Sequence, residues 1–339
     1  MSKLQFPKSV FRHICQLSSD KGILFYSTAD ILVFYSMVSV KCLKDGIRPI
    51  GFSVMMNHYH FEAPFSSDAH MASFMNGVTS PYAKAYNSHY GLSGNVFHRP
   101  FNRSVKYGEK NIKDIFIYIG NNGKEKIPSI KAESYRWNFL MYIVSEHPFS
   151  EPIDYRKASR NLLDLLSIVL NKRSKLQPLG YDLFEGASYR ELNDREKNQL
   201  TDFIINVYFF LDKEKIMSMY GDFEHLCLAM NSVTGKEHEF RDDSSREDYR
   251  HYYRMISICK AHGFDVTKYR FIVPAKYDMR DNAILPLSLT ESLRDKAVLP
   301  SSLKTISPTT FSELIQAFRA EMNVSDYEIA KFFHLLQKE

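Results

Sequence analysis

The stretch IGFSVMMNHYHFEAPF, residues 50–65, carries two histidines one residue apart in an apolar run. Successive side chains of a β-strand alternate faces, so His58 and His60 share one face and Tyr59 takes the other. Their Cβ atoms would lie about 6.6 Å apart, from where both imidazoles can bind one cation. Glu62 shares that face but lies about 13 Å from His58, so it is the weaker ligand candidate. Two histidines at this spacing are ordinary surface or core residues about as often as they are metal ligands. Another element must therefore complete a site.

A second group of chemically useful residues falls on a predicted helix, GEKNIKDIFIYIGNN, over residues 108–122. Tyr118 and Asn122 stand four residues apart and therefore project from one face of that helix. A phenol near a metal ion could attack a phosphorus atom, and an amide oxygen could complete the shell of ligands. Because tyrosine is common here, with 21 residues, and usually packs, the pair has meaning only beside the histidines.

The elements that must bring these residues together alternate along the first 140 residues. Extended patterns alternate with helical ones, and turn or cap signals separate them. The expected elements are a strand over 9–18, a helix over 27–46, two strands over 47–64, a helix over 67–91 that is bent or broken at Pro81, an extended segment over 95–107 and the helix over 108–122. This order, β-α-β-β-α-β-α, predicts an α+β fold, a ferredoxin-like split β-α-β sheet with an extra tyrosine-bearing helix.

Beyond residue 150 the pattern becomes mostly helical, and we divide the chain into three domains on this basis. The sheet and tyrosine helix occupy residues 1–150, and a helical extension occupies 151–277. Residues 278–339 begin with a Pro- and Ser-rich linker carrying one short helix. Two short helices then follow over 311–336, an outline that fits either a DNA-reading helix-turn-helix or an ordinary helical hairpin.

Length and composition place the chain among globular proteins. Its 339 residues are 44% hydrophobic and 14% aromatic, enough to bury a core. No apolar run approaches the length of a membrane span and no signal peptide is evident, so we expect a cytoplasmic protein with no membrane partner. Cys15, Cys42, Cys227 and Cys259 contain no CxxC pair, which argues against a zinc ribbon or a disulfide framework and predicts buried free thiols.

Positive charge is concentrated in the first part of the chain. Residues 1–150 hold 17 Lys and Arg against 10 Asp and Glu, whereas the remainder holds 27 against 29. A basic region with a candidate metal site suits a phosphate-rich ligand, although the excess alone favours nucleic acid only slightly.

Aromatic and basic residues alternate in VFHRPFNRSVKY, residues 96–107. Arg99, Arg103 and Lys106 are the candidate DNA-binding residues, because basic side chains contact phosphates while neighbouring aromatic rings stack on bases. The aromatic residues fit a sheet core at least as well.

The order of these segments resembles the single-tyrosine HUH transposases, especially those related to the REP-associated tyrosine transposases. The resemblance covers about residues 8–141, and four ordered matches carry it: FSVMMNHYHF, LSGNVFHRPFNRSV, FIYIGNN and SYRWNFLMY. By position, His58 and His60 match the metal-binding histidines of that family, Tyr118 its nucleophile and Asn122 its further metal-holding residue. Two features depart from the family: Gly123 stands where relatives often have proline, and the chain continues for about 200 further residues.

The resemblance implies an enzyme, a DNA transposase of the HUH endonuclease type acting in DNA recombination. Such a protein would cut and rejoin single-stranded DNA beside a hairpin, with Mg²⁺ or Mn²⁺ as cofactor and a 5′-phosphotyrosine intermediate, and would act as a homodimer. The alternative is a non-catalytic DNA-binding or regulatory protein that retains the fold. The sequence leaves open which of Asn121 and Asn122 ligates, and whether Tyr118 acts in its own subunit or across a dimer.

Overall fold

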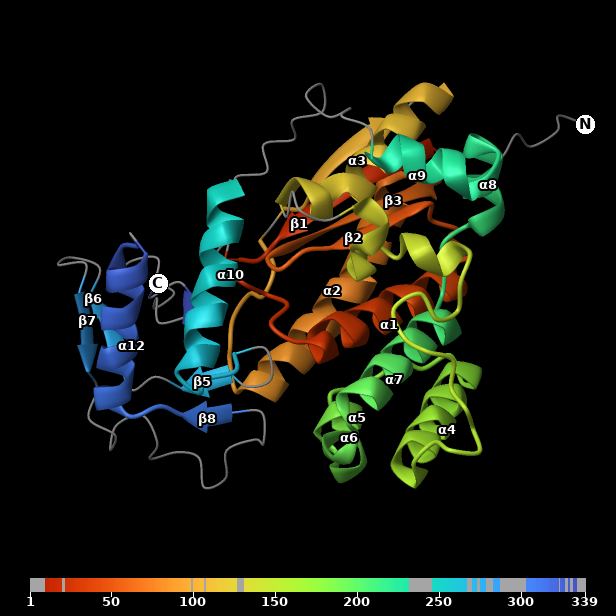
Figure 1. Cartoon of the computed structure of the whole chain (residues 1–339). Helices are drawn as coiled ribbons and strands as arrows, with labels where there is room; N and C mark the ends of the chain where they lie inside the picture. Colours follow the sequence, from red (N-terminus) through yellow and green to blue (C-terminus); the bar gives the residue numbers. More distant parts are fainter. Residues whose placement is uncertain are drawn as a thin grey trace, which may run out of the picture.

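A four-stranded antiparallel sheet with helices on both faces lies at the centre of the structure, a computed structural model (Figure 1). The described residues are 10–19, 22–98, 100–106, 108–126, 131–231, 246–266, 270–272, 275–278, 283–286, 303–322, 324–326, 329, 332 and 333. The fold is α+β, as predicted.

The predicted order of the first elements is confirmed. They are β1 (Val10–Leu17), α1 (Thr28–Asp45), β2 (Gly51–Val54), β3 (His58–Phe65), α2 (Asp68–Tyr90), β4 (Asn102–Lys106) and α3 (Gly108–Lys126). The strands lie in the order β2-β3-β1-β4, and every neighbouring pair is antiparallel.

Local signals set the limits of the helices. Ser27 caps α1 in a reciprocal capping box with Asp30, and Gly46 ends the helix at φ 64°, a conformation that favours glycine. The predicted break at Pro81 is absent, because α2 continues from Asp68 to Tyr90 with Pro81 inside it. Pro81 and Gly77 are both exposed, so water can satisfy the carbonyl that loses its helical partner.

The two faces of the sheet differ in chemistry. One face is apolar, and its residues Phe52, Tyr59 and Phe61 pack on α1 and α2, with the Phe61 and Phe74 rings stacked at 5.4 Å. The strand registers place polar side chains on the opposite face, under α3: Ser53, His58, His60, Glu62, His13, Ser104 and Lys106. The histidine motif therefore lies between the sheet and the tyrosine helix.

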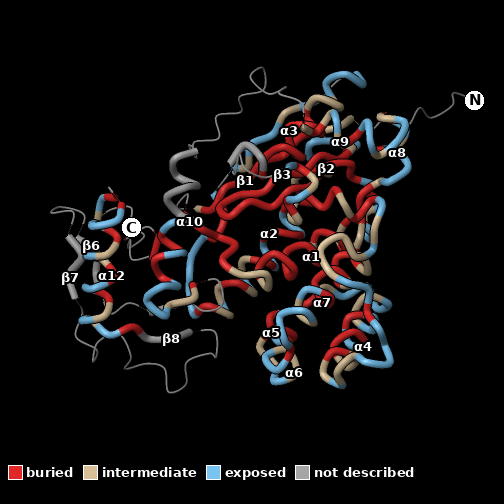
Figure 2. The backbone as a smooth tube through the Cα atoms, viewed as in Figure 1, coloured by how far each residue is buried: buried red, intermediate tan, exposed pale blue. Residues whose placement is uncertain are grey.

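The extension continues the same hydrophobic core. Its helices are α4 (Arg160–Ser174), α5 (Asp182–Glu185), α6 (Ala187–Glu191), α7 (Asp194–Val207), α8 (Lys213–Tyr220) and α9 (Phe223–Asn231). The Tyr35 hydroxyl on α1 donates to the Ile205 carbonyl on α7, and the Tyr35 ring lies 5.1 Å from that of Phe210. Figure 2 shows β1, β2 and β3 as mostly buried, while α4, α5, α6 and α8 carry exposed residues. Residues up to 231 thus share one core across the predicted boundary at 150.

A second hydrophobic cluster joins the last part of the chain to two loops of the sheet. The elements here are α10 (Arg246–Ala261), β5 (Arg270–Ile272), β6 (Ala275–Asp278), β7 (Ala283–Pro286), β8 (Leu303–Thr305) and α12 (Pro308–Glu321). Met55 and Met56, in the turn before His58, pack in this cluster with residues such as Met255 and Phe318. The last part of the chain therefore covers the turn that leads into the histidine motif.

The predicted linker and helix-turn-helix are only partly within the described residues. Strands β7 and β8 fall in the predicted linker over 278–310, most of which lies outside the described residues, as does the short helix expected there. The first helix of the predicted pair is α12. Most of the second falls outside the described residues, although Phe333 donates its amide to the Ile329 carbonyl, as in a helix.

Two further sequence predictions concern thiols and membranes. All four cysteines are free, and three are buried, whereas Cys227 is half-buried. None of the helices within the described ranges is long and apolar enough to cross a membrane.

Candidate active site

The two motif histidines face one another on β3. His58 Nε2 and His60 Nε2 lie 3.1 Å apart, and both side chains are fully buried. The preceding residue, Asn57, orients the first ring, because its Oδ1 lies 2.7 Å from His58 Nδ1. The strand alternation predicted from the sequence is thus confirmed: the imidazoles share a face, while Tyr59 packs in the apolar core.

A third histidine belongs to this group. The sequence predicts His13 to be structural or solvent-facing. It is fully buried, which excludes the second alternative, and its Nε2 lies 3.0 Å from His60 Nδ1. The two rings stack with centroids 5.1 Å apart. The antiparallel register explains the contact: His13 pairs with Glu62 and is therefore diagonal to His60 on the same face. No motif in the sequence indicates that register.

The predicted nucleophile reaches the same cluster. Tyr118 on α3 lies edge-on to His60 at 5.4 Å between ring centroids and to His13 at 6.0 Å. The Tyr118 residue keeps 7% of its surface exposed. A phenol from a helix and imidazoles from two strands therefore meet in one buried polar cluster, within a single chain.

Both asparagines of the tyrosine helix are buried, Asn121 at 4% and Asn122 at 1% exposure. The Asn122 side-chain nitrogen lies 3.4 Å from the Tyr118 carbonyl, where it can donate a long hydrogen bond to its own helix. Its oxygen is then the atom left for another partner. The choice between Asn121 and Asn122 as a ligand stays open.

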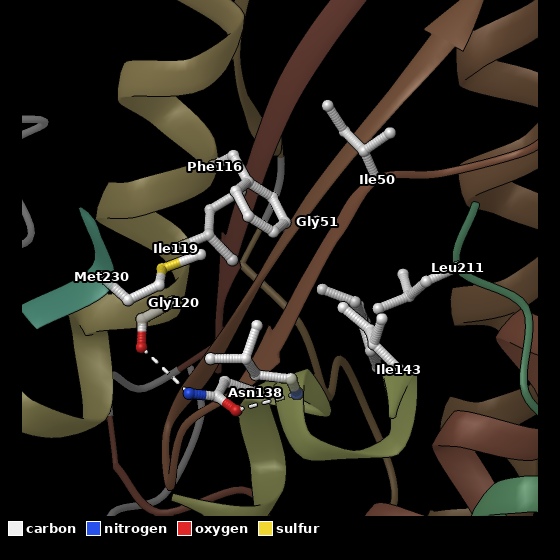
Figure 3. A pocket seen from close by; sticks show the side chains of 11 residues that line it. Ile50, Gly51, Phe116, Ile119, Gly120, Asn138, Ile143, Leu211 and Met230 are labelled. Carbon is white, nitrogen blue, oxygen red and sulfur yellow. Dashed lines mark hydrogen bonds between the residues drawn. The ribbon is translucent and has the colours of Figure 1, made fainter. Parts of the chain in front are cut away.

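Close contacts hold α3 in position over the sheet. A Cβ on Gly120 would lie 2.3 Å from Met230 Sδ of α9, and one on Gly123 would lie 2.4 Å from the Tyr135 ring. Asn138 donates to the Gly120 carbonyl at 3.0 Å, beside a small apolar hollow under α3 (Figure 3). The extension and the segment after α3 therefore pack directly against Gly120 and Gly123, in the turn of α3 that follows Tyr118.

The segment SYRWNFLMY forms this support. Together with the residues just before and after it, it forms the short 3₁₀ helices η1 (Ala132–Ser134), η2 (Arg136–Asn138) and η3 (Leu140–Ile143). The Tyr135 hydroxyl donates to the Val54 carbonyl of β2 at 2.8 Å. This part of the resembling sequence therefore fastens the tyrosine helix to the sheet.

Glu62 supplies a buried carboxyl on the same face. It is fully buried, and desolvation raises its pKa well above the ordinary value, while the Lys106 charge lowers it. Burial in turn lowers the pKa of Lys106, which the Glu62 charge raises. These two residues are the acidic and basic members of the polar face.

Arg103 and Lys106, two of the three candidate DNA-binding residues, do not share one surface. Arg103 and Lys106 are three positions apart on β4, so they point to opposite faces of the sheet. Arg103 is paired with Asp68 at the start of α2, at 3.2 Å, whereas Lys106 lies on the histidine face. Odd spacing already implied this separation. Arg99 lies outside the described residues.

The histidine pair fits a metal ion in part. Two ligands at right angles, each about 2.1 Å from an ion, lie about 3.0 Å apart, close to the observed 3.1 Å between the Nε2 atoms. Within the described part of the chain, no group of three or more His, Cys, Asp or Glu side chains is arranged to hold a metal. His58 and His60 are therefore two neighbouring ligand positions that need an amide, water or substrate oxygen to complete a shell.

The comparisons with known proteins give little beyond this geometry. No family model matches the sequence, and no curated protein matches it. A solved structure of the REP-associated tyrosine transposase bound to a REP hairpin aligns with 47% of this chain and 98% of its own. The identity is 13% and the TM-score 0.35, a distant likeness from which we infer neither fold nor function.

Proposed function

We propose that this protein is a metal-dependent single-stranded DNA endonuclease and strand transferase, with Tyr118 as its nucleophile. The observation that carries the proposal is the meeting of Tyr118 with the His58 and His60 pair, whose facing nitrogen atoms suit one cation. A protein that only binds DNA needs neither a phenol nor paired imidazoles at such a point.

Each residue has a defined role in the proposed reaction. The Tyr118 oxygen attacks phosphorus, the bond from phosphorus to the 3′ oxygen breaks, and the phenol proton passes to that oxygen directly or through water. The products are a 5′-phosphotyrosine and a free 3′-hydroxyl, and another 3′-hydroxyl can reverse the step to rejoin DNA. His58 and His60, with Asn122 or Asn121, would hold Mg²⁺ or Mn²⁺, which would stabilise charge on the phosphate.

The geometry favours catalysis within one subunit. Tyr118 lies against His60 of the same chain, so no partner is needed to assemble the cluster. The homodimer and the hairpin in the substrate remain part of the proposal, as does the ferredoxin-like class of the sheet, for which the strand order β2-β3-β1-β4 is the support.

Formation of a covalent adduct tests the proposal. Purified protein is incubated with Mn²⁺ and labelled single-stranded fragments from the flanks of its own gene, and the products are separated in SDS. We expect a protein–DNA adduct that EDTA prevents, and peptide mapping should place the nucleotide on Tyr118. Failure to form an adduct with any fragment, or an adduct on another tyrosine, would contradict the proposal.

The alternative, a non-catalytic DNA-binding or regulatory protein, has one observation in its favour. His58 and His60 are fully buried, so a phosphate cannot reach them in this conformation. Under the main proposal the cover over the cluster must open for DNA to enter. A protein that binds the same fragments tightly, yet forms no adduct at any Mn²⁺ concentration, would support the alternative.

A further inference from the structure

A continuous series of contacts joins His13, His60, His58 and Asn57. His13 Nε2 faces His60 Nδ1 at 3.0 Å, and His60 Nε2 faces His58 Nε2 at 3.1 Å. His58 Nδ1 faces Asn57 Oδ1 at 2.7 Å. Every contact in this series has hydrogen-bond length, so in the absence of a cation each needs one proton between its two atoms.

The position of each proton in these contacts follows from the contact between Asn57 and His58. With its amide oxygen facing the ring, Asn57 can only accept, so His58 carries its proton on Nδ1 and presents a lone pair at Nε2. His60 must then donate from Nε2 to His58, which leaves its Nδ1 as an acceptor. His13 in turn must donate from Nε2. Without a cation, neutral His60 and His13 are both Nε2–H tautomers.

A shared cation would reverse two of these three tautomers. Ligation uses the lone pairs of both His58 Nε2 and His60 Nε2, so the His60 proton must move to Nδ1. There it faces His13 Nε2, which must now accept, and the His13 proton must move to its own Nδ1. Each ring keeps one proton, and His58 does not change. The hydrogen bond at His60 Nδ1 forms in both the metal-free and the metal-bound state only if its partner can donate in the first and accept in the second.

We propose that His13 is a positioning residue that lets His60 alternate between a metal-free and a metal-binding tautomer. This inference rests on the proposed metal site and adds to it a residue on another strand. An imidazole suits the role because each ring nitrogen can be donor or acceptor, whereas a carboxylate only accepts. The two ring planes lie within 19° of one another with centroids 5.1 Å apart, and the facing nitrogen atoms stay within hydrogen-bond distance.

The tautomers can be read directly by nitrogen NMR of protein labelled in its histidine rings, with assignments from single His→Gln variants. At pH 8, above the ordinary imidazole pKa of about 6.5, we expect Nε2–H forms for His13 and His60 and an Nδ1–H form for His58. Addition of Zn²⁺, a diamagnetic probe that imidazoles bind, should convert His13 and His60 to Nδ1–H. An Nδ1–H form of His60 before metal, or an unchanged His13 after it, would overturn the proposal.

Two variants separate positioning from packing. His13→Phe keeps an aromatic ring but cannot hydrogen-bond, and His13→Gln can donate or accept. We expect Mn²⁺ affinity, measured by calorimetry, to fall about 10- to 100-fold in His13→Phe, as for residues behind a metal ligand, and to recover in His13→Gln. Equal affinity in wild type and His13→Phe, with both shown to be folded by circular dichroism, would refute the role.

The readouts also distinguish this inference from the proposed function. Tautomers and metal affinity require no DNA and no nucleophile, so they can be measured in Tyr118→Phe protein. If the tautomers change as expected but no adduct ever forms, the proposed function fails and the role of His13 stands. If the adduct forms but His13→Phe binds Mn²⁺ normally, the role of His13 fails alone.

Discussion

The two faces of the central sheet bury side chains of opposite character, apolar on one face and polar on the other. On one face, Phe52 and Phe61 pack against α1 and α2 in an apolar core. On the other, His13, His60 and Glu62 are equally buried, beneath α3. The same strands supply both sets, because side chains alternate between the faces.

This difference indicates where function lies. Burial of apolar side chains stabilises a fold, whereas burial of polar ones costs free energy unless they are well hydrogen-bonded. A face that keeps several buried histidines and a carboxyl therefore costs stability that an apolar face would not. If the polar face is retained for chemistry, changes on it should affect cleavage more than changes on the apolar face.

The largest effect is expected from removing residues 151–339, because this segment packs against α1 on one side of the sheet and α3 on the other. The truncation exposes Tyr35 on α1, fully buried at present, and removes Met230 from Gly120 on α3. We expect an insoluble fragment, measured by the soluble fraction after expression. A chain ending at residue 231 keeps the contacts of Tyr35 and Gly120 and is the control for these two contacts. A soluble, cleaving fragment 1–150 would show that the first domain folds independently.

Loss of one oxygen atom should next abolish the chemistry. Tyr118→Phe keeps the ring that packs on His60 but lacks the nucleophile. We expect no SDS-resistant adduct and DNA binding within a few fold of wild type, measured by fluorescence anisotropy. Adduct formation by this variant would remove Tyr118 from its role.

Removal of either imidazole should weaken cleavage without unfolding the protein. For His58→Ala and His60→Ala we expect at least about a 100-fold loss in adduct formation at low Mn²⁺, because a direct ligand is worth more than a residue behind it. The matched control is Phe61→Leu, on the other face of the same strand. It should cost up to about 1.5 kcal/mol in stability and leave cleavage by folded protein unchanged. Equal activity in the histidine variants would assign them to structure.

The smallest effect concerns the buried carboxyl of the polar face. Because burial raises the Glu62 pKa, the folded protein holds a proton that the unfolded chain releases above pH 4.5, the ordinary value. Stability should therefore fall as the pH rises from that value towards the folded-state pKa. In metal-free buffer, Glu62→Gln should be more stable than wild type at pH 8 by on the order of 1 kcal/mol, and equally stable near pH 4, in urea unfolding. A larger fall in stability for the variant would show that the charged carboxyl is favourable.

Short-range patterns in the sequence were sufficient for many features. Ser27 and Gly46 mark the ends of α1 because capping depends on residues a few positions apart. The shared face of His58 and His60, and that of Tyr118 and Asn122, follow from the periods of strand and helix. The placement of Arg103 and Lys106 on opposite faces follows in the same way from their odd spacing on a strand.

Tertiary structure decided which of these faces meet. His13 joins His60 because β1 pairs with β3 in one register, and a shift of one residue would turn it to the other face. Met230 reaches Gly120 from more than 100 positions along the chain. Periodicity acts within one element, whereas registers and contacts between elements depend on packing of the whole core, so the sequence by itself determined the candidate groups and the fold determined the cluster.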